Sequence, residues 1–365
     1  MPKKKNLMTK SEMKEFGPLK KILVILPNYI GDVMISTPAL HLLKKFSPDS
    51  NIYVLTTSVG REILEANQDI DEIITRPLKL KFKDRISLIK NVKKLKPDCV
   101  LLFRTTFFNS LLSYLSGAEI RAGVNREFSG IFLNKLINED KKRRFRDEYL
   151  KILFSVFPYK NDFAKDEEIY KMRIYTDQND KKFADEILSG YRLKDNFAVI
   201  MASTTRHSKN WPLKNYALVI DGLKDRFGLT TVLVGSENDF MANEKIIEFS
   251  KHKPINLAGK TKIRQLAEII RRASLFIGPD TGAMYISSAV GTNTIALFGS
   301  TDSEKCGPFD ESKQIIIYKK FSCSPCHKNF CSRASKNEIA PCMDSITPEE
   351  VLEKVELFKD FHSRG

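Results

Sequence analysis

The sequence predicts an α/β protein with two domains, each built on a parallel β-sheet. With 365 residues, the chain exceeds the size that one hydrophobic core usually supports. Short β-branched apolar runs alternate with helical patterns over residues 21–124, and the alternation restarts at residue 196. A charged stretch of low periodicity, residues 162–195, separates the two series and is the expected domain boundary. Strands that alternate with helices form parallel sheets with covered faces.

The first domain is expected to span residues 21–180. Its apolar runs predict strands at residues 21–27, 51–57, 98–104 and 119–124. Helical patterns lie between these runs, and the first of them continues to Phe46. Residues 1–20 are charged and aperiodic, which predicts a mobile basic tail.

The second domain is expected to span residues 195–345. Its strands are expected at residues 196–202, 230–236, 274–280 and 294–300. The last three of these runs end at glycine within their last few residues, and two such α/β units normally bind a ligand between their loop-rich carboxyl edges. A final helix over residues 347–362 should begin at Thr347, because Pro348 suits the first helical position and Glu350 completes a capping box.

Composition and charge narrow the class of protein. The chain is 42% hydrophobic and 29% charged, and no apolar run reaches the roughly 18 residues that span a bilayer, so we expect a cytoplasmic protein. Its net charge of +15 predicts an acidic partner, for which nucleic acid, anionic lipid and a phosphorylated substrate all qualify. Basic clusters at residues 79–96 and 141–146 both lie in the first half. Each could be a solvated helix face, but together they favour an anionic acceptor or a membrane surface.

The segment FIGPDTGAMYIS, residues 276–287, carries the strongest local signal. An apolar strand breaks at glycine and proline and then feeds a helix, whose first backbone N–H groups can hold an anion. We expect Asp280 to face sugar hydroxyls and the amides of Thr281 and Gly282 to hold a diphosphate, as a nucleotide sugar requires. An ordinary strand-to-helix turn with a good cap is the alternative interpretation.

Three further segments place polar groups after predicted strands. Asp32 follows the first strand at a helix start, where it could remain a carboxylate and accept a proton during a reaction, or serve as an N-cap. Residues 203–212, STTRHSKNWP, offer hydroxyls, Arg206 and Lys209 to a diphosphate, although a surface loop with Trp211 packed between domains is the alternative. Glu237 lies where a nucleotide fold holds the ribose diol, and it could also cap a helix.

Other catalytic and metal patterns are weak or missing from the sequence. There is no GxxxxGK[ST] loop and no HExxH motif, so neither an ATPase nor a hydrolase is indicated. Four cysteines near the end of the chain could hold zinc, but their spacing matches no standard zinc ribbon, and disulfides are not expected in a reducing cytoplasm. They are Cys323, Cys326, Cys331 and Cys342.

Together these segments resemble glycosyltransferase family 9, the ADP-heptose:lipopolysaccharide heptosyltransferases. The resemblance covers most of the chain, and this set of motifs in this order is more specific than any one of them. The motifs are Gly31-Asp32 with Pro38, TTRxxKxWP at residues 204–212, GSE at 235–237, DTGxM at 280–284, LFGSTD at 297–302 and the cysteine segment that ends in CMDSITPEEV. The resemblance implies a GT-B fold, in which two Rossmann-like domains face each other across a cleft and the C-terminal helix crosses back onto the first domain.

The resemblance also implies an activity and residue roles. The enzyme would move heptose from ADP-L-glycero-D-manno-heptose to the inner core of lipopolysaccharide with inversion, and Asp32 would be the general base. Lys209 would offset the charge of the leaving ADP, and neither a cofactor nor a metal is implied. The donor would be held by Thr204, Thr205, Lys209, Glu237, Asp280, Thr281, Gly282 and Tyr285. Tyr285 departs from the family pattern, which usually has histidine there, and this departure favours as an alternative a family 9 enzyme that uses another nucleotide sugar.

The resemblance gives the basic first domain an anionic target, the lipid A and Kdo core. The residues expected to contact this acceptor are Arg104, Arg121, Arg143 and Arg146. We expect a monomer that associates peripherally with the cytoplasmic face of the inner membrane of a Gram-negative bacterium. A basic nucleic-acid-binding protein is the remote alternative, but the sequence has no recognised nucleic-acid-binding module, so no nucleic-acid partner is expected.

Overall fold

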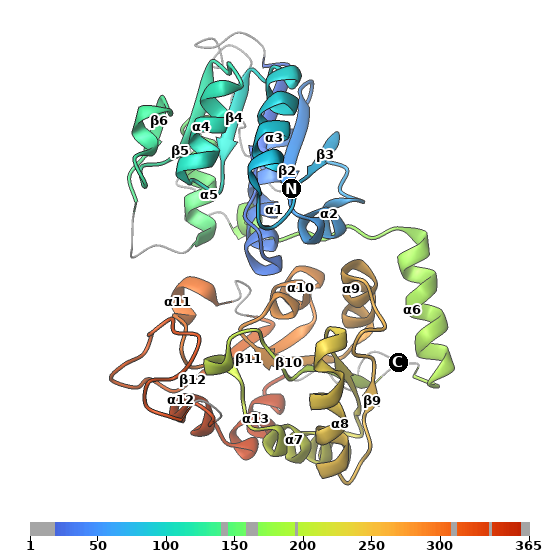
Figure 1. The fold of residues 1–365 in the computed structure, drawn as a ribbon. Helices are drawn as coiled ribbons and strands as arrows, with labels where there is room; N and C mark the ends of the chain where they lie inside the picture. Colours follow the sequence, from blue (N-terminus) through green and yellow to red (C-terminus); the bar gives the residue numbers. More distant parts are fainter. Residues whose placement is uncertain are drawn as a thin grey trace, which may run out of the picture. The chain divides into compact units, whose positions relative to one another are not determined.

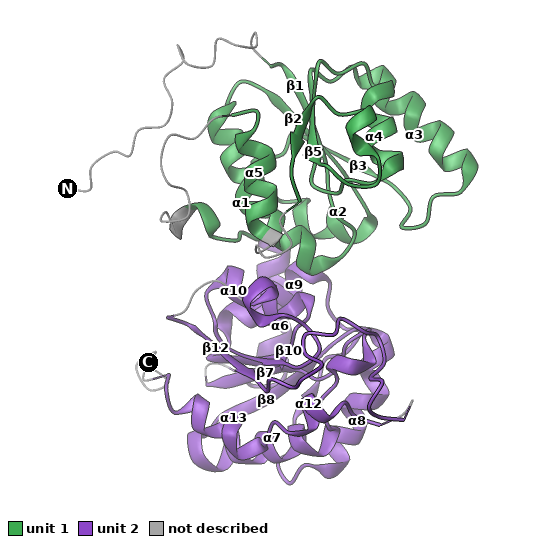
Figure 2. Ribbon diagram, turned by 90° about the vertical axis from the view of Figure 1, so that its left-hand side faces the viewer, with its two compact units in different colours: residues 1–175 green, residues 176–365 purple. Residues whose placement is uncertain are grey.

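The chain forms two compact units, residues 1–175 and residues 176–365 (Figure 2). The computed structural model describes residues 19–139, 145–157, 167–193, 196–307, 312–335 and 338–358. The division between the units falls inside residues 162–195, the stretch that was expected to separate two domains. Most of the expected basic tail, residues 1–18, lies outside the described residues.

Within the described residues, unit 1 contains a parallel sheet in the order β3-β2-β1-β4-β5-β6. Its strands are β1 Lys21–Ile25, β2 Asn51–Thr56, β3 Glu72–Thr75, β4 Cys99–Leu102, β5 Ile120–Val124 and β6 Lys135–Ile137. The central strand β1 pairs with both β2 and β4, so that Leu23 stands opposite Tyr53 and Val100. This order is that of a Rossmann-like unit, whose carboxyl edge binds ligands.

The helices of unit 1 cover both faces of its sheet. They are α1 Ile30–Phe46, α2 Ser58–Leu64, α3 Phe82–Leu95, α4 Phe107–Leu115 and α5 Phe145–Phe154, with short 3-10 helices η1 Ser129–Ile131 and η3 Glu167–Tyr170. Figure 2 shows α1 and α5 on one face and α3 and α4 on the other. Leu88 and Val92 of α3 and Leu112 of α4 are buried against β1 and β4. These apolar contacts leave the opposite sides of α3 and α4 facing outward.

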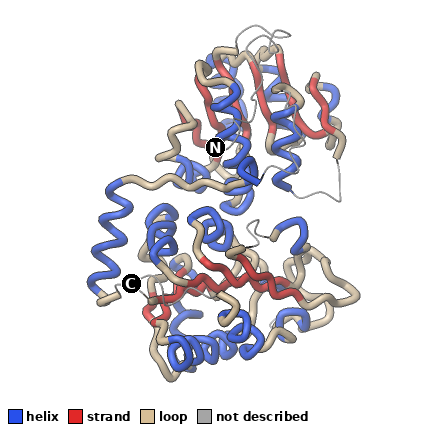
Figure 3. The backbone as a smooth tube through the Cα atoms, turned by 180° about the vertical axis from the view of Figure 1, so that it is seen from behind, coloured by secondary structure: helices blue, strands red, loops and turns tan. Residues whose placement is uncertain are grey.

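Unit 2 repeats the architecture with the strand order β12-β11-β10-β7-β8-β9 among the described residues. Its strands are β7 Phe197–Met201, β8 Thr230–Val234, β9 Ile255–Asn256, β10 Leu275–Pro279, β11 Asn293–Phe298 and β12 Gln314–Tyr318. In Figure 3 these strands form one row with helices on both faces. The eight strands expected from the sequence are all present, and the four that the sequence did not predict, β3, β6, β9 and β12, are the edge strands of the two sheets.

The helices of unit 2 also form two layers (Figure 1). They are α6 Gln178–Gly190, α7 Leu213–Phe227, α8 Phe240–Phe249, α9 Ile263–Arg272, α10 Gly282–Val290, α11 Ser303–Cys306, α12 Pro341–Asp344 and α13 Pro348–Val355, with 3-10 helices η4 His207–Lys209 and η5 Glu237–Asp239. Figure 1 shows α9 and α10 on one face of the sheet and α7, α8 and α13 on the other. In the described part of the chain, none of the helices combines the length and apolarity that crossing a bilayer requires.

The last described helix, α13, begins where it was expected. The Thr347 hydroxyl accepts a hydrogen bond from the Glu350 backbone N–H at 3.2 Å, and Pro348 is the first helical residue. The expected capping box does not form, because the Glu350 carboxylate instead pairs with Lys319 at 2.8 Å. The helix ends at Val355, short of the expected residue 362, because residues 356–357 already form a turn, and it packs on α7 within unit 2. Residues 359–365 lie outside the described residues, so the return of the chain to the first domain stays a prediction.

Candidate active site

The structure brings together two motifs of unit 2 that the sequence singled out. The loop after β7 ends in η4 with Lys209, and Asp280 follows β10, which pairs with β7. The Lys209 Nζ lies 2.5 Å from Asp280 Oδ2 and 3.1 Å from the Asp280 carbonyl oxygen. The two side chains are 13% and 7% exposed, so most of this ion pair is shielded from water. A cation held this firmly at a sheet's carboxyl edge can stabilise negative charge that develops on a bound group.

The N-terminus of α10 lies directly after this ion pair. Thr281 occupies the N-cap position with extended backbone, and Gly282 is the first helical residue. The Thr281 hydroxyl oxygen is buried and has no hydrogen-bond partner among the described residues. A buried polar group without a partner is uncommon, and a helix N-terminus attracts anions. The hydroxyl and the first amides of α10 therefore form a set of donors that fits a phosphate.

Tyr285 lies on α10 and supports Asp280 from inside the unit. Its side chain is buried, and its hydroxyl donates a hydrogen bond of 2.6 Å to the Cys306 carbonyl oxygen. The same hydroxyl is 3.5 Å from Asp280 Oδ1, which is at the limit of a hydrogen bond. Tyr285 thus links the strand end that carries Asp280 to α11. Its predicted contact with the donor stays a prediction.

The loop between β7 and α7 is held by its own side chains. The Thr204 hydroxyl donates to the Arg206 carbonyl oxygen at 2.6 Å, and the Thr204 backbone N–H donates to Asn210 Oδ1 at 3.0 Å. Ser208 is buried, and its backbone N–H donates to the Asn329 carbonyl oxygen at 2.9 Å. These bonds fix the segment that presents Lys209, while Thr205 is exposed beside it.

Trp211, just beyond that loop, belongs to the core of unit 2. Its side chain is fully buried, its ring meets the Tyr216 ring edge-on at 4.8 Å, and its indole N–H donates to the Ile346 carbonyl oxygen at 2.9 Å. The alternative interpretation, a surface loop with Trp211 packed between domains, is therefore wrong, because Trp211 is fully buried and these partners belong to unit 2. The ring anchors the end of the Lys209 segment.

Glu237 lies at the neighbouring strand end and is not used as a cap. Ser236 is the N-cap of η5, and Asp239 completes a capping box, since its Oδ2 accepts hydrogen bonds of 2.7 Å from both the backbone N–H and the hydroxyl of Ser236. The Glu237 side chain is exposed and has no hydrogen-bond partner among the described residues. Gly259 has a φ of +74°, and a Cβ there would lie 3.1 Å from the Glu237 Cα, so this glycine lets the next loop pack close behind Glu237. The carboxylate is thus available to accept hydrogen bonds from hydroxyl groups.

In unit 1, Asp32 lies in the first turn of α1, just after β1. It is not the N-cap, because that position is Tyr29, whose side chain makes no capping bond. The buried Tyr149 of α5 lies close enough for Asp32 to raise its pKa, after the larger effect of burial. The carboxylate is half-buried at the carboxyl edge of the sheet. This placement fits a group that takes a proton from a bound hydroxyl.

Arg76, which the sequence analysis did not single out, lies at the same edge, directly after β3. It is 6% exposed, and its Nη2 donates to Asn28 Oδ1 at 2.7 Å, while its buried Nε has no partner among the described residues. Burial lowers the pKa of Arg76, and the charge of Arg104 lowers it further. A buried cation beside a second cation, with an unused donor, is suited to an anion. The only sequence signal was an arginine directly after a short β-branched run.

The other expected acceptor residues differ in place. Arg104 follows β4 and lies near Arg76, as its electrostatic effect shows. Arg121 lies near the amino end of β5, and its Nε donates to the Phe132 carbonyl oxygen at 2.7 Å, so the structure does not bring it to the edge that carries Asp32. Arg146 lies at the start of α5 with its guanidinium 3.8 Å from the centre of the Tyr170 ring. Arg143 lies outside the described residues.

The four cysteines near the end of the chain, of which Cys342 lies in α12, are all free thiols. Burial raises the pKa of Cys342, with smaller contributions from Cys331, Cys326 and Cys323, so the four lie in one region of unit 2. Among the described residues, no group of three or more His, Cys, Asp or Glu side chains is arranged to hold a metal ion. The sequence left open whether these cysteines bind a metal, and the described residues show no preformed metal site there.

Comparisons with known proteins identify the family and the fold of the chain. A family model described as glycosyltransferase family 9 (heptosyltransferase) matches residues 85–336. Lipooligosaccharide heptosyltransferase 2 of Campylobacter jejuni is 23% identical over 94% of this chain and 99% of that protein. Lipopolysaccharide heptosyltransferase 3 of Escherichia coli is 28% identical over 89% of this chain and 95% of that protein. The solved structure of E. coli ADP-heptose lipopolysaccharide heptosyltransferase II is similar with a TM-score of 0.76 and 21% identity, over 92% of this chain and 98% of that chain, which shows the GT-B fold.

Proposed function

The chain belongs to glycosyltransferase family 9, and from this premise we propose that it transfers heptose from ADP-L-glycero-D-manno-heptose to the inner core of lipopolysaccharide. The single observation that carries the proposal is the shielded Lys209–Asp280 ion pair beside the N-terminus of α10. It places a cation, a carboxylate and helix amides at one strand end, as a sugar joined to a diphosphate requires. The names of the Campylobacter and Escherichia relatives support the heptose and the lipopolysaccharide core.

For the donor, we assign the diphosphate to Lys209 and to the Thr281 hydroxyl and first amides of α10. The unpartnered Thr281 oxygen supports this assignment, because a phosphate oxygen would satisfy it. Glu237, exposed at the end of β8, would accept hydrogen bonds from the ribose hydroxyls, and Asp280 would accept them from the heptose. Thr204, Thr205 and Tyr285 are assigned supporting contacts around the donor.

For the reaction, we propose that Asp32 is the general base. Its carboxylate takes the proton of an acceptor hydroxyl, and the resulting oxygen forms a bond to the anomeric carbon on the face opposite the diphosphate. The bond between that carbon and the diphosphate oxygen breaks, and its electron pair leaves with ADP. Lys209 and the amides of α10 stabilise the charge that gathers on ADP, so the configuration inverts without a metal or cofactor in our proposal.

For the acceptor, we assign its anionic groups to Arg76 and Arg104, and a further contact to Arg146 at the start of α5. The buried Arg76 supports this assignment. A carboxylate or phosphate would accept a hydrogen bond from its unpartnered Nε–H and would balance the positive charges of Arg76 and the nearby Arg104. The lipid A and Kdo core carries such groups and is anchored in a membrane by acyl chains. We therefore infer a peripheral enzyme at the cytoplasmic face of the inner membrane, active as a monomer.

One observation favours a second candidate, the same inverting reaction with a different nucleotide sugar. Tyr285 stands where the family usually has histidine, and its hydroxyl reaches toward Asp280, the residue assigned to the donor sugar. A neutral phenol presents different hydrogen-bonding from an imidazole that can be charged. The nucleic-acid-binding alternative is not favoured, because the chain belongs to a glycosyltransferase family.

Calorimetric titration tests the donor assignment. We expect ADP-heptose to bind more tightly than ADP alone, UDP-glucose or GDP-mannose, and this preference to be lost in Glu237→Ala and Asp280→Ala. Tighter binding of UDP-glucose or GDP-mannose would select the second candidate, and no binding of any of them would contradict both.

Transfer to a water-soluble acceptor tests the base. Asp32→Asn should abolish ADP release while it leaves donor binding intact. Asp84→Asn is the matched control, because Asp84 also lies in the first turn of a unit 1 helix. Equal activity of the two variants would show that Asp32 is not the base.

A further inference from the structure

The outer side of α4 is apolar rather than polar. Phe107, Tyr114 and Leu115 are 49%, 54% and 37% exposed, and their spacing places them on one side of the helix. A helix on the surface of a soluble domain normally turns polar residues outward. This side of α4 therefore calls for an apolar or amphipathic partner.

The apolar surface continues from α4 onto the loop around η1. Phe128 and Ile131 are 82% and 72% exposed. The loop is tied to α4, because Glu127 Oε2 accepts a hydrogen bond from the Phe107 backbone N–H at 3.2 Å and the Phe107 ring meets the Phe132 ring at 5.5 Å. We call this surface the apolar ridge, and it consists of Phe107, Tyr114, Leu115, Phe128 and Ile131. Contiguous exposed apolar surface of this kind marks interaction sites.

The neighbouring helix α3 adds unneutralised positive charge. It packs beside α4, and the Arg85 guanidinium lies 5.1 Å from the centre of the Phe108 ring. Phe82 and Ile86 of α3 are 78% and 40% exposed, so α3 also presents apolar groups among its cations. None of its lysines has an ion-pair partner among the described residues, and they are Lys83, Lys90, Lys93 and Lys94.

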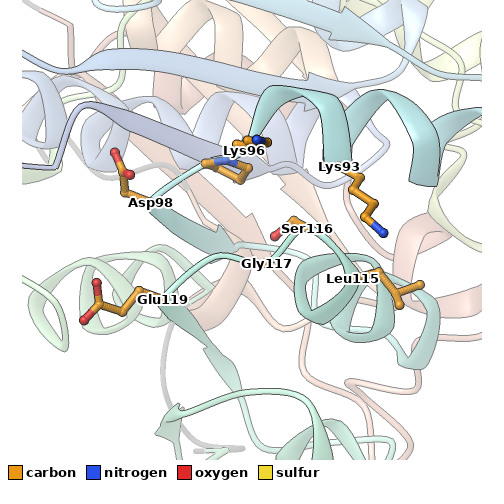
Figure 4. Close-up of a pocket in the computed structure, with 8 residues that line it drawn as sticks. Lys93, Lys96, Asp98, Leu115, Ser116, Gly117 and Glu119 are labelled. Atoms are coloured by element: carbon orange, nitrogen blue, oxygen red, sulfur yellow. The ribbon is translucent and has the colours of Figure 1, made fainter.

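Cationic and apolar groups meet where the two helices end. Figure 4 shows a hollow lined by Lys93 from α3 and Leu115 from α4, with Lys96 after α3. Asp98 and Glu119 line the same hollow, so its charge is mixed, and the excess of lysines lies on α3 itself. Lys96 has no ion-pair partner among the described residues either. The mixture of charge and apolar surface thus extends along both helices and is not confined to one end.

We propose that α3, α4 and η1 form a docking surface for an anionic lipid membrane. The apolar ridge enters the boundary between headgroups and acyl chains, and the lysines of α3 contact the lipid phosphates. The proposal rests on the proposed function in one respect, since lipid A holds the acceptor in a membrane. The surface itself is defined by exposure and charge alone.

The place of the ridge in unit 1 fits an acceptor delivered from a membrane. Phe107 begins the helix after β4, and Phe128 follows β5, so both lie toward the carboxyl edge of the sheet. Asp32 and Arg76 lie at the same edge of the same sheet. An acceptor whose acyl chains stay in the bilayer would present its anionic sugars to Arg76 while the ridge holds the enzyme at the surface.

Other partners fit the surface less well. A two-fold contact with a second copy would bring two sets of unpaired lysines together, and like charges across an interface oppose binding. Nucleic acid would satisfy the lysines but would leave aliphatic groups such as Ile131 and Leu115 without a complementary partner. Both alternatives are outcomes of the test below.

Vesicle sedimentation of the full chain provides the test, with phosphatidylglycerol–phosphatidylcholine vesicles compared with pure phosphatidylcholine. Lys90→Glu/Lys93→Glu and Phe128→Ser/Ile131→Ser should each weaken binding to the anionic vesicles about tenfold or more. The matched controls lie in unit 2, where Lys182→Glu/Lys245→Glu reverses two exposed charges and Leu218→Ser/Met241→Ser removes two exposed apolar side chains. The controls should bind within about twofold of the wild type.

A second measurement separates docking from the reaction. The docking variants should transfer sugar to a deacylated, water-soluble acceptor at the wild-type rate and lose transfer only to lipid-bound acceptor. Docking variants that bind vesicles like the controls would overturn the proposal, as would a ridge-dependent dimer or ridge-dependent DNA binding without vesicle binding. The wild-type protein could also transfer no heptose while its docking variants still lose vesicle binding. That result would refute the proposed function and support the docking surface.

Discussion

Replacing Lys209 with methionine tests whether this lysine acts on the leaving group or only neutralises Asp280. Methionine keeps most of the aliphatic stem and removes the charge that lies 2.5 Å from Asp280 Oδ2. Removing one partner of a buried ion pair costs about 3–5 kcal/mol of folding stability, because the other charge stays buried without compensation. With side chains only 13% and 7% exposed, the pair falls in that class, so we expect a loss of about 3 kcal/mol in the free energy of unfolding.

The expected loss of activity has a separate cause. Removing one preorganised group that stabilises developing charge lowers kcat about a hundredfold to a thousandfold. The double variant Lys209→Met/Asp280→Asn removes both charges, so it should regain most of the lost stability but none of the lost kcat. The two quantities therefore respond differently if Lys209 faces the diphosphate.

Urea unfolding and the rate of ADP release measure the two effects. Lys305→Met is the matched control, because Lys305 also pairs with an aspartate in unit 2 but at 3.5 Å and nearer the surface, where such pairs contribute at most about 1 kcal/mol. Recovery of transfer in the double variant would show that Lys209 serves only Asp280. A single variant with wild-type kcat would refute its role on the leaving group altogether.

Three further changes test other parts of the structure. Arg76→Gln keeps a donor toward Asn28 but removes the buried charge, so the KM for the anionic acceptor should rise about tenfold or more while the KM for the donor stays unchanged in steady-state kinetics. Burial raises the pKa of Glu268, but its hydrogen bonds to Thr176 and Arg272 outweigh burial and hold that pKa below its usual value of 4.5. The stability it contributes is therefore present above pH 4.5 and lost as the pH falls through the lowered pKa, and urea midpoints should fall less on acidification in Glu268→Gln than in the wild type. Trp211→Phe leaves a buried carbonyl oxygen without its indole donor and a space beside it, so the free energy of unfolding should fall by about 2–4 kcal/mol in urea titration.

The interior of each sheet could be predicted from the sequence, whereas the edges could not. Interior strands such as β1 are buried on both faces and therefore read as continuous apolar runs. The edge strands β3 and β6 are short and only half-buried, and β9 has only two residues, so they carry little hydrophobic signal. The edge strand β12 does contain the apolar run Ile315–Ile317, which the sequence analysis passed over.

The candidate site was predictable to the extent that it follows interior strands. Lys209 and Asp280 lie 71 residues apart in sequence, and each was singled out because it follows a predicted strand of the second domain, whereas their ion pair was not predicted. Arg76 was missed because it follows an edge strand that was itself missed. The lowered pKa of Arg76 comes from its burial and from the charge of Arg104, and neither can be inferred from the residues next to Arg76 in the sequence.

Tyr285, in place of the histidine that the family resemblance leads one to expect, changes both the charge and the hydrogen bonding available beside Asp280. A histidine at this position could be cationic near neutral pH and so could add a second positive charge beside the carboxylate. Here the Tyr285 hydroxyl donates to the Cys306 carbonyl oxygen at 2.6 Å, and Lys209 is the one ion-pair partner of Asp280 among the described residues. The carboxylate oxygen nearer to Tyr285 is therefore free of a strong partner on that side, since 3.5 Å is a weak contact. In the proposed donor site, a sugar that offers a hydroxyl to this oxygen would gain more from Asp280 here than beside a charged imidazole, so we expect hydroxyl geometry at Asp280 to influence the choice of sugar.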